Sequence, residues 1–186
     1  FRRVLFRSVR KKSGKLRLCV DYRKVNARTI RDSYPIPKIE DMFASLHGSS
    51  YYVTMDIKQG YFNVPMEQFS KDITAFTCPF GLFSFEKMSQ GLVNSPFTFQ
   101  RLMDKCMGDL NMKEVLVFID DMIVHGKSLE EMEERLLKTL GRLRTFGLKV
   151  DPKKCTFFSK SVKHLGHIVS AEGIKPDPDK ISALTS

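Results

Sequence analysis

The amino-acid sequence predicts an α+β fold in which a sheet carries helices on one face. Segments with strand-like alternation and segments with helical spacing are mixed along the chain, without the regular βαβ order of a parallel-sheet protein. The 186 residues contain no internal repeat, low-complexity tract or Gly/Ser linker. We therefore expect one domain or a large piece of one, long enough to bury a real core.

The first half of the chain is predicted to contain strands and one short helix. "KLRLCVDYRKVN" (15–26) begins with alternation and predicts a strand that enters a polar turn. "DSYPIPKIEDMFASLHG" predicts a helix over 37–47, with Pro37 in its first turn and its apolar residues on one face. "YYVTMDI" (51–57) predicts a strand, and "FNVPM" with "TAFTCPFGLFSFEKM" predicts a hairpin after it.

The second half contains two clearer helices. "NSPFTFQRLMDKCMG" predicts a helix capped by Ser95. Ser128 and Glu131 form a capping-box pattern that opens a helix of about 18 residues ending at Gly147. A strand near 148–151 and a hairpin within "VKHLGHIVSAEGIKP" complete the expected elements.

Two adjacent acids interrupt the apolar segment "VFIDDMIV" (117–124). Strand-forming runs flank them, which predicts a hairpin with Asp120 and Asp121 at its tip. The simplest interpretation is that the pair only makes the turn. Asn-Gly or Asp-Gly would serve a tight turn better, because the second position usually takes a positive φ. The pair therefore favours a further role.

A third acid, Asp56, has the same setting near the end of a predicted apolar strand. The three acids would meet if the strands 51–57 and 115–119 were neighbours. Placing two carboxylates within about 4 Å costs on the order of 4 kcal/mol at an effective dielectric of about 20. A pair of Mg²⁺ ions would offset that cost. On these residues alone, a two-metal nuclease, a polymerase and a metal-free basic binding domain all stay open.

The net charge favours a polyanionic partner, because 31 Lys and Arg stand against 21 Asp and Glu, giving +10. The opening "FRRVLFRS" resembles a translated sequencing-library adapter, so we expect residues 1–8 to be non-native. The charge without that segment is 28 minus 21, or +7.

No apolar run reaches the roughly 18 residues of a membrane helix. Four cysteines without a CxxC pair indicate reduced thiols in an intracellular protein.

Six motifs in one order resemble the reverse transcriptases of Gypsy-type LTR retrotransposons. They are "LCVDYRKVN", "MDIKQGY", "SQGLVNSPFTFQ", "FIDDMIV", "GLKVDPKKC" and "VKHLGHIV". The resemblance covers roughly residues 9–184 and implies a right-hand polymerase palm with partial fingers, truncated before the thumb. It implies an RNA-directed DNA polymerase, a nucleotidyltransferase, taken from a retrotransposon polyprotein. The alternative is a catalytically silent nucleic-acid-binding relic of such an element.

The resemblance also implies partners and a location. We expect an RNA template, a DNA primer or duplex and dNTP as partners, together with the rest of a polyprotein that includes thumb, RNase H, integrase and protease. No membrane partner is expected. The implied location is intracellular, in the cytoplasm with virus-like particles or in the nucleus. We expect weak or no activity from the isolated fragment, because processive synthesis needs a thumb.

The metal site follows from the same resemblance. Asp56 and Asp120 match the family's ligands for two Mg²⁺ ions, for which Mn²⁺ can substitute. Asp121 would add charge and geometry, and the backbone carbonyl of Ile57 would complete the site. Lys154, in the family's "PKK" position with Lys153, would protonate the leaving pyrophosphate. Two surface lysines in a turn are the simpler alternative.

Other matched positions imply contacts to the nucleotide and the primer. The predicted nucleotide-binding residues are Lys11, Arg17, Gln59, Gly60, Tyr61 and Gln90. Tyr61 matches the aromatic residue that stacks under the sugar and excludes a ribose 2′-OH. Leu165 and Gly166 match the primer grip. His164 and His167 are three residues apart, so on one strand they would point to opposite faces, which argues against a zinc site with Cys155.

Several positions depart from the Gypsy-type pattern. Gln90 stands where such elements usually carry an aromatic residue and where retroviral enzymes carry glutamine. Leu16 and Ser89 replace a common aromatic residue and a common proline, and "HG" at 125–126 replaces an aromatic-serine pair. None of these departures involves the carboxylates.

Overall fold

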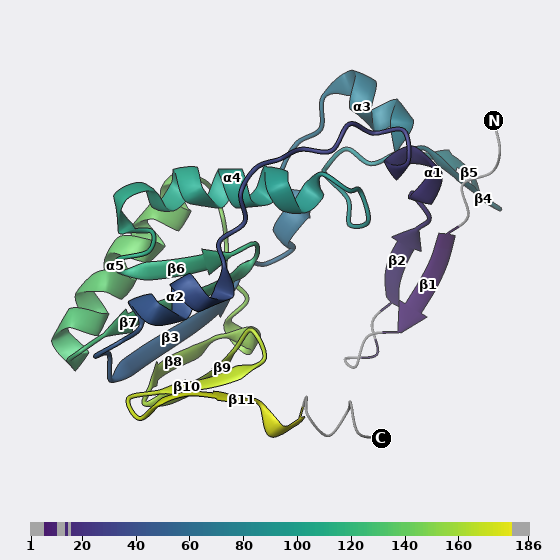
Figure 1. Ribbon diagram of the computed structural model, residues 1–186. Helices are drawn as coiled ribbons and strands as arrows, with labels where there is room; N and C mark the ends of the chain where they lie inside the picture. The colour runs from purple at the N-terminus through teal and green to yellow at the C-terminus, as the bar shows by residue number, and fades with distance from the viewer. Residues whose placement is uncertain (1–5, 11–13, 15, 180–186) are drawn as a thin grey trace. The chain divides into compact units, whose positions relative to one another are not determined.

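The structure is a computed structural model that describes residues 6–10, 14 and 16–179. The chain divides into two compact units (Figure 1). Unit 1 contains residues 1–34 and 59–99, and unit 2 contains residues 35–58 and 100–186. In the described part, no helix is both long and apolar enough to cross a membrane.

Unit 2 is built on an antiparallel sheet with the strand order β6-β7-β3-β8. Its strands are β3 (Tyr51–Asp56), β6 (Val115–Phe118), β7 (Asp121–Gly126) and β8 (Thr156–Ser159). A second antiparallel sheet, in the order β11-β10-β9, is formed by β9 (Ser161–His164), β10 (His167–Ser170) and β11 (Gly173–Pro176). The predicted α+β class is confirmed.

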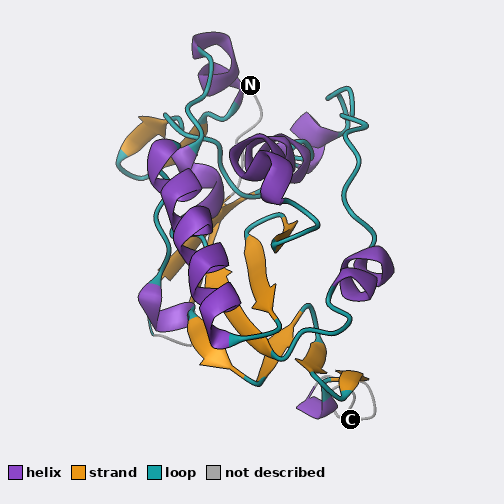
Figure 2. Cartoon of the chain, turned by 90° about the vertical axis from the view of Figure 1, so that its left-hand side faces the viewer, coloured by secondary structure: helices purple, strands orange, loops and turns teal. Residues whose placement is uncertain are grey.

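Helices cover both faces of the four-stranded sheet, so the expectation that they would lie on one face only is wrong. The unit contains α2 (Ile39–Ser45), the longer part of α4 (Ser95–Met107), α5 (Leu129–Thr145) and the 3-10 turns η2 (Gly108–Leu110) and η3 (Pro152–Lys154). In Figure 2, α5 lies on one side of the strands and α2 on the other. Met42 and Leu46 bring α2 into a core cluster with Leu116, Ile123 and Val169, so this cluster joins the two sheets.

The capping box of α5 forms as expected. The Glu131 amide donates to the Ser128 hydroxyl over 3.2 Å, and the Glu131 carboxylate accepts from the Lys127 amide over 2.7 Å. These bonds satisfy amides that a helix start leaves unpaired. The helix spans 17 residues, close to the expected 18, and packs against β7 and β3.

Unit 1 consists of short elements tied together by loops. They are β1 (Phe6–Arg10), β2 (Leu16–Val20), α1 (Arg23–Asn26), η1 (Gly60–Asn63), α3 (Gln68–Ile73), β4 (Phe76–Cys78) and β5 (Gly81–Phe83). The hairpin expected through "FNVPM" and "TAFTCPFGLFSFEKM" is confirmed in part. β4 pairs with β5 inside the second segment. The first segment meets the end of the second at an antiparallel bridge between Pro65 and Lys87, where the Met66 amide donates to the Glu86 carbonyl over 3.2 Å and the Met88 amide donates to the Val64 carbonyl over 2.9 Å.

Candidate active site

Strand pairing in unit 2 brings the three predicted aspartates to one edge of the sheet. Asp56, the last residue of β3, is paired directly with Asp121, the first residue of β7. Asp120 precedes β7 in the turn, and its carbonyl accepts from the Ile57 amide over 3.3 Å. The condition under which the sequence would bring the acids together, direct pairing of 115–119 with 51–57, does not hold, because β7 lies between β6 and β3. The acids meet because the turn carries them to the end of β3.

The turn itself differs from the expected one. Phe118 pairs with Asp121, so the two turn residues are Ile119 and Asp120, not Asp120 and Asp121. Ile119 has a φ of 58°, a value that suits glycine at the first position of a type II′ hairpin turn. A β-branched residue in this region is strained by about 1–3 kcal/mol. The aspartate pair therefore straddles the turn and the strand that follows it.

A lysine already neutralises the first aspartate. Lys154 Nζ lies 2.9 Å from Asp56 Oδ1 and 2.8 Å from Asp56 Oδ2. A backbone hydrogen bond brings the two residues together, because the Asp151 amide donates to the Asp56 carbonyl over 3.0 Å. The turn η3, which contains Lys154, begins at the next residue. The hydrogen bond to Asp56 raises the pKa of Lys154, and the charges of Asp56, Asp151 and Asp120 add to that effect.

This arrangement fits a cation at Asp56. An ammonium group occupies both carboxylate oxygens, and hard oxygen donors of this kind are those that Mg²⁺ prefers. Ile57 and Val150 lie opposite each other in an antiparallel bridge, and the hydrogen bonds of that bridge come from their neighbours. The Lys58 amide donates to the Lys149 carbonyl, and the Asp151 amide donates to the Asp56 carbonyl. Neither bond uses the Ile57 carbonyl. Among the described residues, no three His, Cys, Asp or Glu side chains form a preassembled metal cluster.

The predicted primer grip is a tight turn in unit 2. Leu165 and Gly166 have φ values of 47° and 79° and connect β9 with β10. His164 and His167 flank the turn as a directly opposed pair. The prediction that they point to opposite faces is wrong, because opposed residues of a hairpin share one face. His167 packs its ring edge-on against Phe43, with centroids 4.9 Å apart.

In unit 1, the residues after Asp56 form a compact turn. Gln59 is left-handed with a φ of 65°, and Gly60 is buried at the start of η1. Tyr61 is half-buried and meets Phe99 edge to face, with ring centroids 5.5 Å apart and planes at 76°. This contact holds the tyrosine ring in one orientation, so the ring can present a rigid aromatic surface.

The loop that carries Gln90 is held by residues to which sequence reasoning gave no role. Gln90 is exposed, and its neighbours are anchored: Asn26 donates to the Gly91 carbonyl over 2.8 Å and accepts from the Val93 amide over 2.9 Å. Tyr22 accepts from the buried Ser89 hydroxyl over 3.3 Å. Both anchors, Tyr22 and Asn26, lie in the "LCVDYRKVN" motif, and that motif is the sequence signal that could have identified them.

Ser95 also serves this loop. It was predicted to cap the following helix, but α4 begins at Ser95 itself. Its hydroxyl donates to the Ser89 carbonyl over 2.9 Å.

Lys11 lies outside the described residues. Arg17 is in β2, where its backbone pairs with Val9, and its role stays a prediction.

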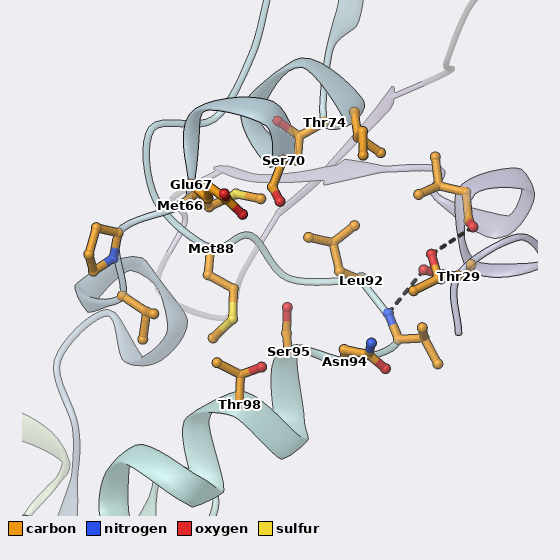
Figure 3. A pocket seen from close by; sticks show the side chains of 16 residues that line it. Thr29, Met66, Glu67, Ser70, Thr74, Met88, Leu92, Asn94, Ser95 and Thr98 are labelled. Carbon is orange, nitrogen blue, oxygen red and sulfur yellow. Dashed lines mark hydrogen bonds between the residues drawn. The ribbon is translucent and has the colours of Figure 1, made fainter. Parts of the chain in front are cut away.

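Unit 1 also contains a cavity of about 310 Å³ (Figure 3). Its walls combine apolar side chains such as Met66, Met88 and Leu92 with the hydroxyls of Ser70 and Thr98. None of the predicted site residues lines it. This cavity is therefore separate from the residues that the sequence predicts as the site.

Comparison with known proteins agrees with this geometry. Residues 9–169 match the family described as reverse transcriptase (RNA-dependent DNA polymerase). The chain is 37% identical over 174 residues to the retrovirus-related Pol polyprotein from transposon 297 of Drosophila melanogaster, covering 94% of this chain and 16% of the relative. It is 33% identical to the corresponding polyprotein from transposon gypsy of the same species, covering 90% of this chain and 16% of the relative. The chain thus spans about a sixth of these polyproteins.

Solved structures share the fold. A foamy viral protease-reverse transcriptase in complex with double-stranded DNA is 26% identical, with a TM-score of 0.89 over 99% of this chain and 33% of that one. A foamy viral protease-reverse transcriptase in complex with an RNA/DNA hybrid, at 24% identity and a TM-score of 0.87, covers 99% of this chain and 25% of its own. The predicted polymerase palm is thereby confirmed. The chain belongs to the reverse transcriptase (RNA-dependent DNA polymerase) family.

Proposed function

We propose that the chain provides the catalytic palm and part of the fingers of an RNA-directed DNA polymerase encoded by a retrotransposon. The observation that carries the proposal is the pairing of Asp56 with Asp121 beside the Asp120 turn. The family match and the Pol polyprotein relatives support the same activity. The reaction joins a primer 3′-hydroxyl to the α-phosphate of a dNTP and releases pyrophosphate.

Asp56, Asp120, Asp121 and the Ile57 carbonyl would hold two divalent ions, Mg²⁺ or Mn²⁺. Such ions stabilise the negative charge that develops in phosphoryl transfer and favour ionisation of the attacking hydroxyl. In the described structure Lys154 neutralises Asp56 in their place. Lys154, which lies beside Asp56, would donate its proton to the pyrophosphate oxygen as the general acid.

Residues of unit 1 would select and hold the nucleotide. The Tyr61 ring, which contacts Phe99 edge to face, would support the sugar and exclude a 2′-hydroxyl. The amides of Gln59 and Gly60 donate to the triphosphate, while the exposed Gln90 contacts the sugar. Arg17 would contribute a charge that stays fixed at any working pH.

The charge distribution supports nucleic-acid binding by unit 1. Its two segments hold 14 Lys and Arg against 5 Asp and Glu, a net +9, whereas unit 2 holds 17 against 16, a net +1. Without Arg2, Arg3 and Arg7 the count in unit 1 is still 11 against 5. Nearly all of the excess charge therefore belongs to this unit, as expected where phosphates are bound.

The test is dNTP incorporation on a primed RNA template with Mg²⁺, measured beside duplex binding. The protein is used in the longest form that its coding sequence provides. Synthesis that stops when EDTA is added supports the proposal. Tight duplex binding by a folded protein that performs no synthesis favours the silent relic instead.

A further inference from the structure

The turn that carries Asp120 is held from a helix. Ile119, the first turn residue, adopts a φ of 58°, which a β-branched residue avoids unless its surroundings impose it. Because Asp120 follows directly, its position depends on that strained conformation. The carbonyl of Asp120 is tied on one side to the Ile57 amide. The Ile119 end of the turn needs a partner as well.

Gln100 of α4 supplies that partner. Its Oε1 accepts from the Ile119 amide over 2.7 Å, a short bond for two neutral groups. Its Nε2 donates to the Val117 carbonyl over 3.2 Å and to Asp104 Oδ1 over 2.9 Å. One side chain therefore binds the backbone on both sides of Phe118, at the start of the turn that carries Asp120.

The grip is rigid. Gln100 is fully buried, and both donors of its amide and its acceptor are used. Asp104 is fixed in turn by Asn111, whose Nδ2 donates to the same oxygen over 2.9 Å. Because a buried amide that loses a partner is penalised, the three bonds hold Gln100 in one rotamer.

We propose that Gln100 is a positioning residue for catalysis, which holds Ile119 in its strained conformation and so keeps Asp120 beside the end of β3 that carries Asp56. This inference rests on the proposed function for its activity readout, but not for its structural one. Gln100 contacts the turn backbone and no reacting atom. Its loss displaces a carboxylate ligand and leaves nucleotide binding by unit 1 intact.

The first experiment compares Gln100→Met, which keeps the shape and removes the bonds, with Thr139→Val as a matched control. Thr139 is also fully buried in unit 2, and its hydroxyl donates only to the Arg135 carbonyl of its own helix, over 2.8 Å. Gln100→Met is expected to lower kcat roughly 10- to 100-fold with an unchanged KM for dNTP, and to raise the Mg²⁺ concentration for half-maximal rate. Thr139→Val should leave all three values within about twofold.

A double-mutant cycle with Ile119→Gly separates positioning from general destabilisation. Glycine takes a positive φ without strain, so the turn then needs less support. Gln100→Met should therefore cost clearly less kcat in the Ile119→Gly background than alone. Losses that simply multiply would overturn the proposal, as would a folded Gln100→Met protein with normal kcat.

Amide hydrogen exchange at Ile119 gives a readout that needs no activity. Gln100→Met should speed exchange at this amide by roughly tenfold while the amides of α5 keep their protection. Unchanged protection at Ile119 would overturn the inference even if synthesis fell. If the wild type performs no synthesis, the exchange result still decides whether Gln100 holds the turn. If Gln100→Met does not fold, Gln100→Asn serves, because it keeps a buried amide that is one methylene too short.

Discussion

Lys154 Nζ bridges both carboxylate oxygens of Asp56, at 2.8 and 2.9 Å, across 98 residues of sequence. The lysine side chain is 59% exposed and the aspartate side chain 22% exposed, so the pair lies at the rim of the site. It is a pair that a divalent ion can open, because exposed ion pairs contribute only about 0–1 kcal/mol.

Removing this lysine should affect metal binding and chemistry in opposite directions. Lys154→Met removes a competing cation, so Mg²⁺ should bind up to about fivefold more tightly, as measured by titration calorimetry. The rate of nucleotide incorporation should fall, because the general acid is lost. Lys153→Met, the neighbouring lysine, is the control for charge alone. Weaker Mg²⁺ binding by Lys154→Met would contradict the competition between Lys154 and the metal.

Tyr61 should control the choice of sugar. Tyr61→Val removes the ring that Phe99 supports, so the ratio of rNTP to dNTP incorporation should rise by at least roughly tenfold. The measurement is kcat/KM for each nucleotide on one primed template. Tyr61→Phe keeps the ring and should retain discrimination. A Tyr61→Val protein that discriminates as well as wild type would remove Tyr61 from this role.

Two glycines of unit 2 should respond oppositely to alanine. A Cβ on Gly126 would lie 3.0 Å from the Met132 amide nitrogen and 3.2 Å from its Cα, both backbone atoms that cannot turn aside. Gly126→Ala should therefore destabilise the fold by about 1–3 kcal/mol. Gly141, exposed within α5, has nothing within 4 Å, so Gly141→Ala should stabilise by about 0.5–1 kcal/mol. Urea unfolding measures both, and a stabilising Gly126→Ala would contradict the close packing of α5 on β7.

Stability should fall as the pH falls below about 6.5, because two histidines are buried without a partner on Nε2. Burial lowers the pKa of His164 to about 4. Burial and the charge of Arg135 lower the pKa of His125 to about 4, against the opposing effect of Glu131. The unfolded chain, with histidine pKa values near 6.5, binds more protons between pH 6.5 and 4. The stability present above pH 6.5 is therefore lost toward pH 4, by about 2–3 kcal/mol per histidine.

Urea unfolding at pH 7 and pH 5 tests this dependence. His164→Leu should flatten the decline, while His47→Gln, at an exposed position, should leave it in place. A wild-type stability that does not change over this range would contradict neutral burial of both rings.

The sequence predicted the fold class and the elements with strong periodicity, such as the capped helix after Ser128. It could not place the turn at Ile119 and Asp120, because local propensity opposes a β-branched residue at positive φ, and a distant side chain, Gln100, stabilises it. The sequence could not predict the contact between Lys154 and Asp56 either, since the two residues are far apart in the chain. The face shared by His164 and His167 required knowing that Leu165 and Gly166 form a two-residue turn.

The most direct test of the central claim is single-turnover incorporation of one dNTP by Asp56→Asn and Asp120→Asn proteins, with Asp109→Asn as control. Asp109 is an acid of the same unit that pairs with Arg142 at the surface. We expect both site variants to lose synthesis by at least roughly a thousandfold while they bind primer-template duplex with wild-type affinity, and the control to remain active. Synthesis at a normal rate by either site variant would contradict the assignment of the aspartates at the end of β3 as the catalytic centre.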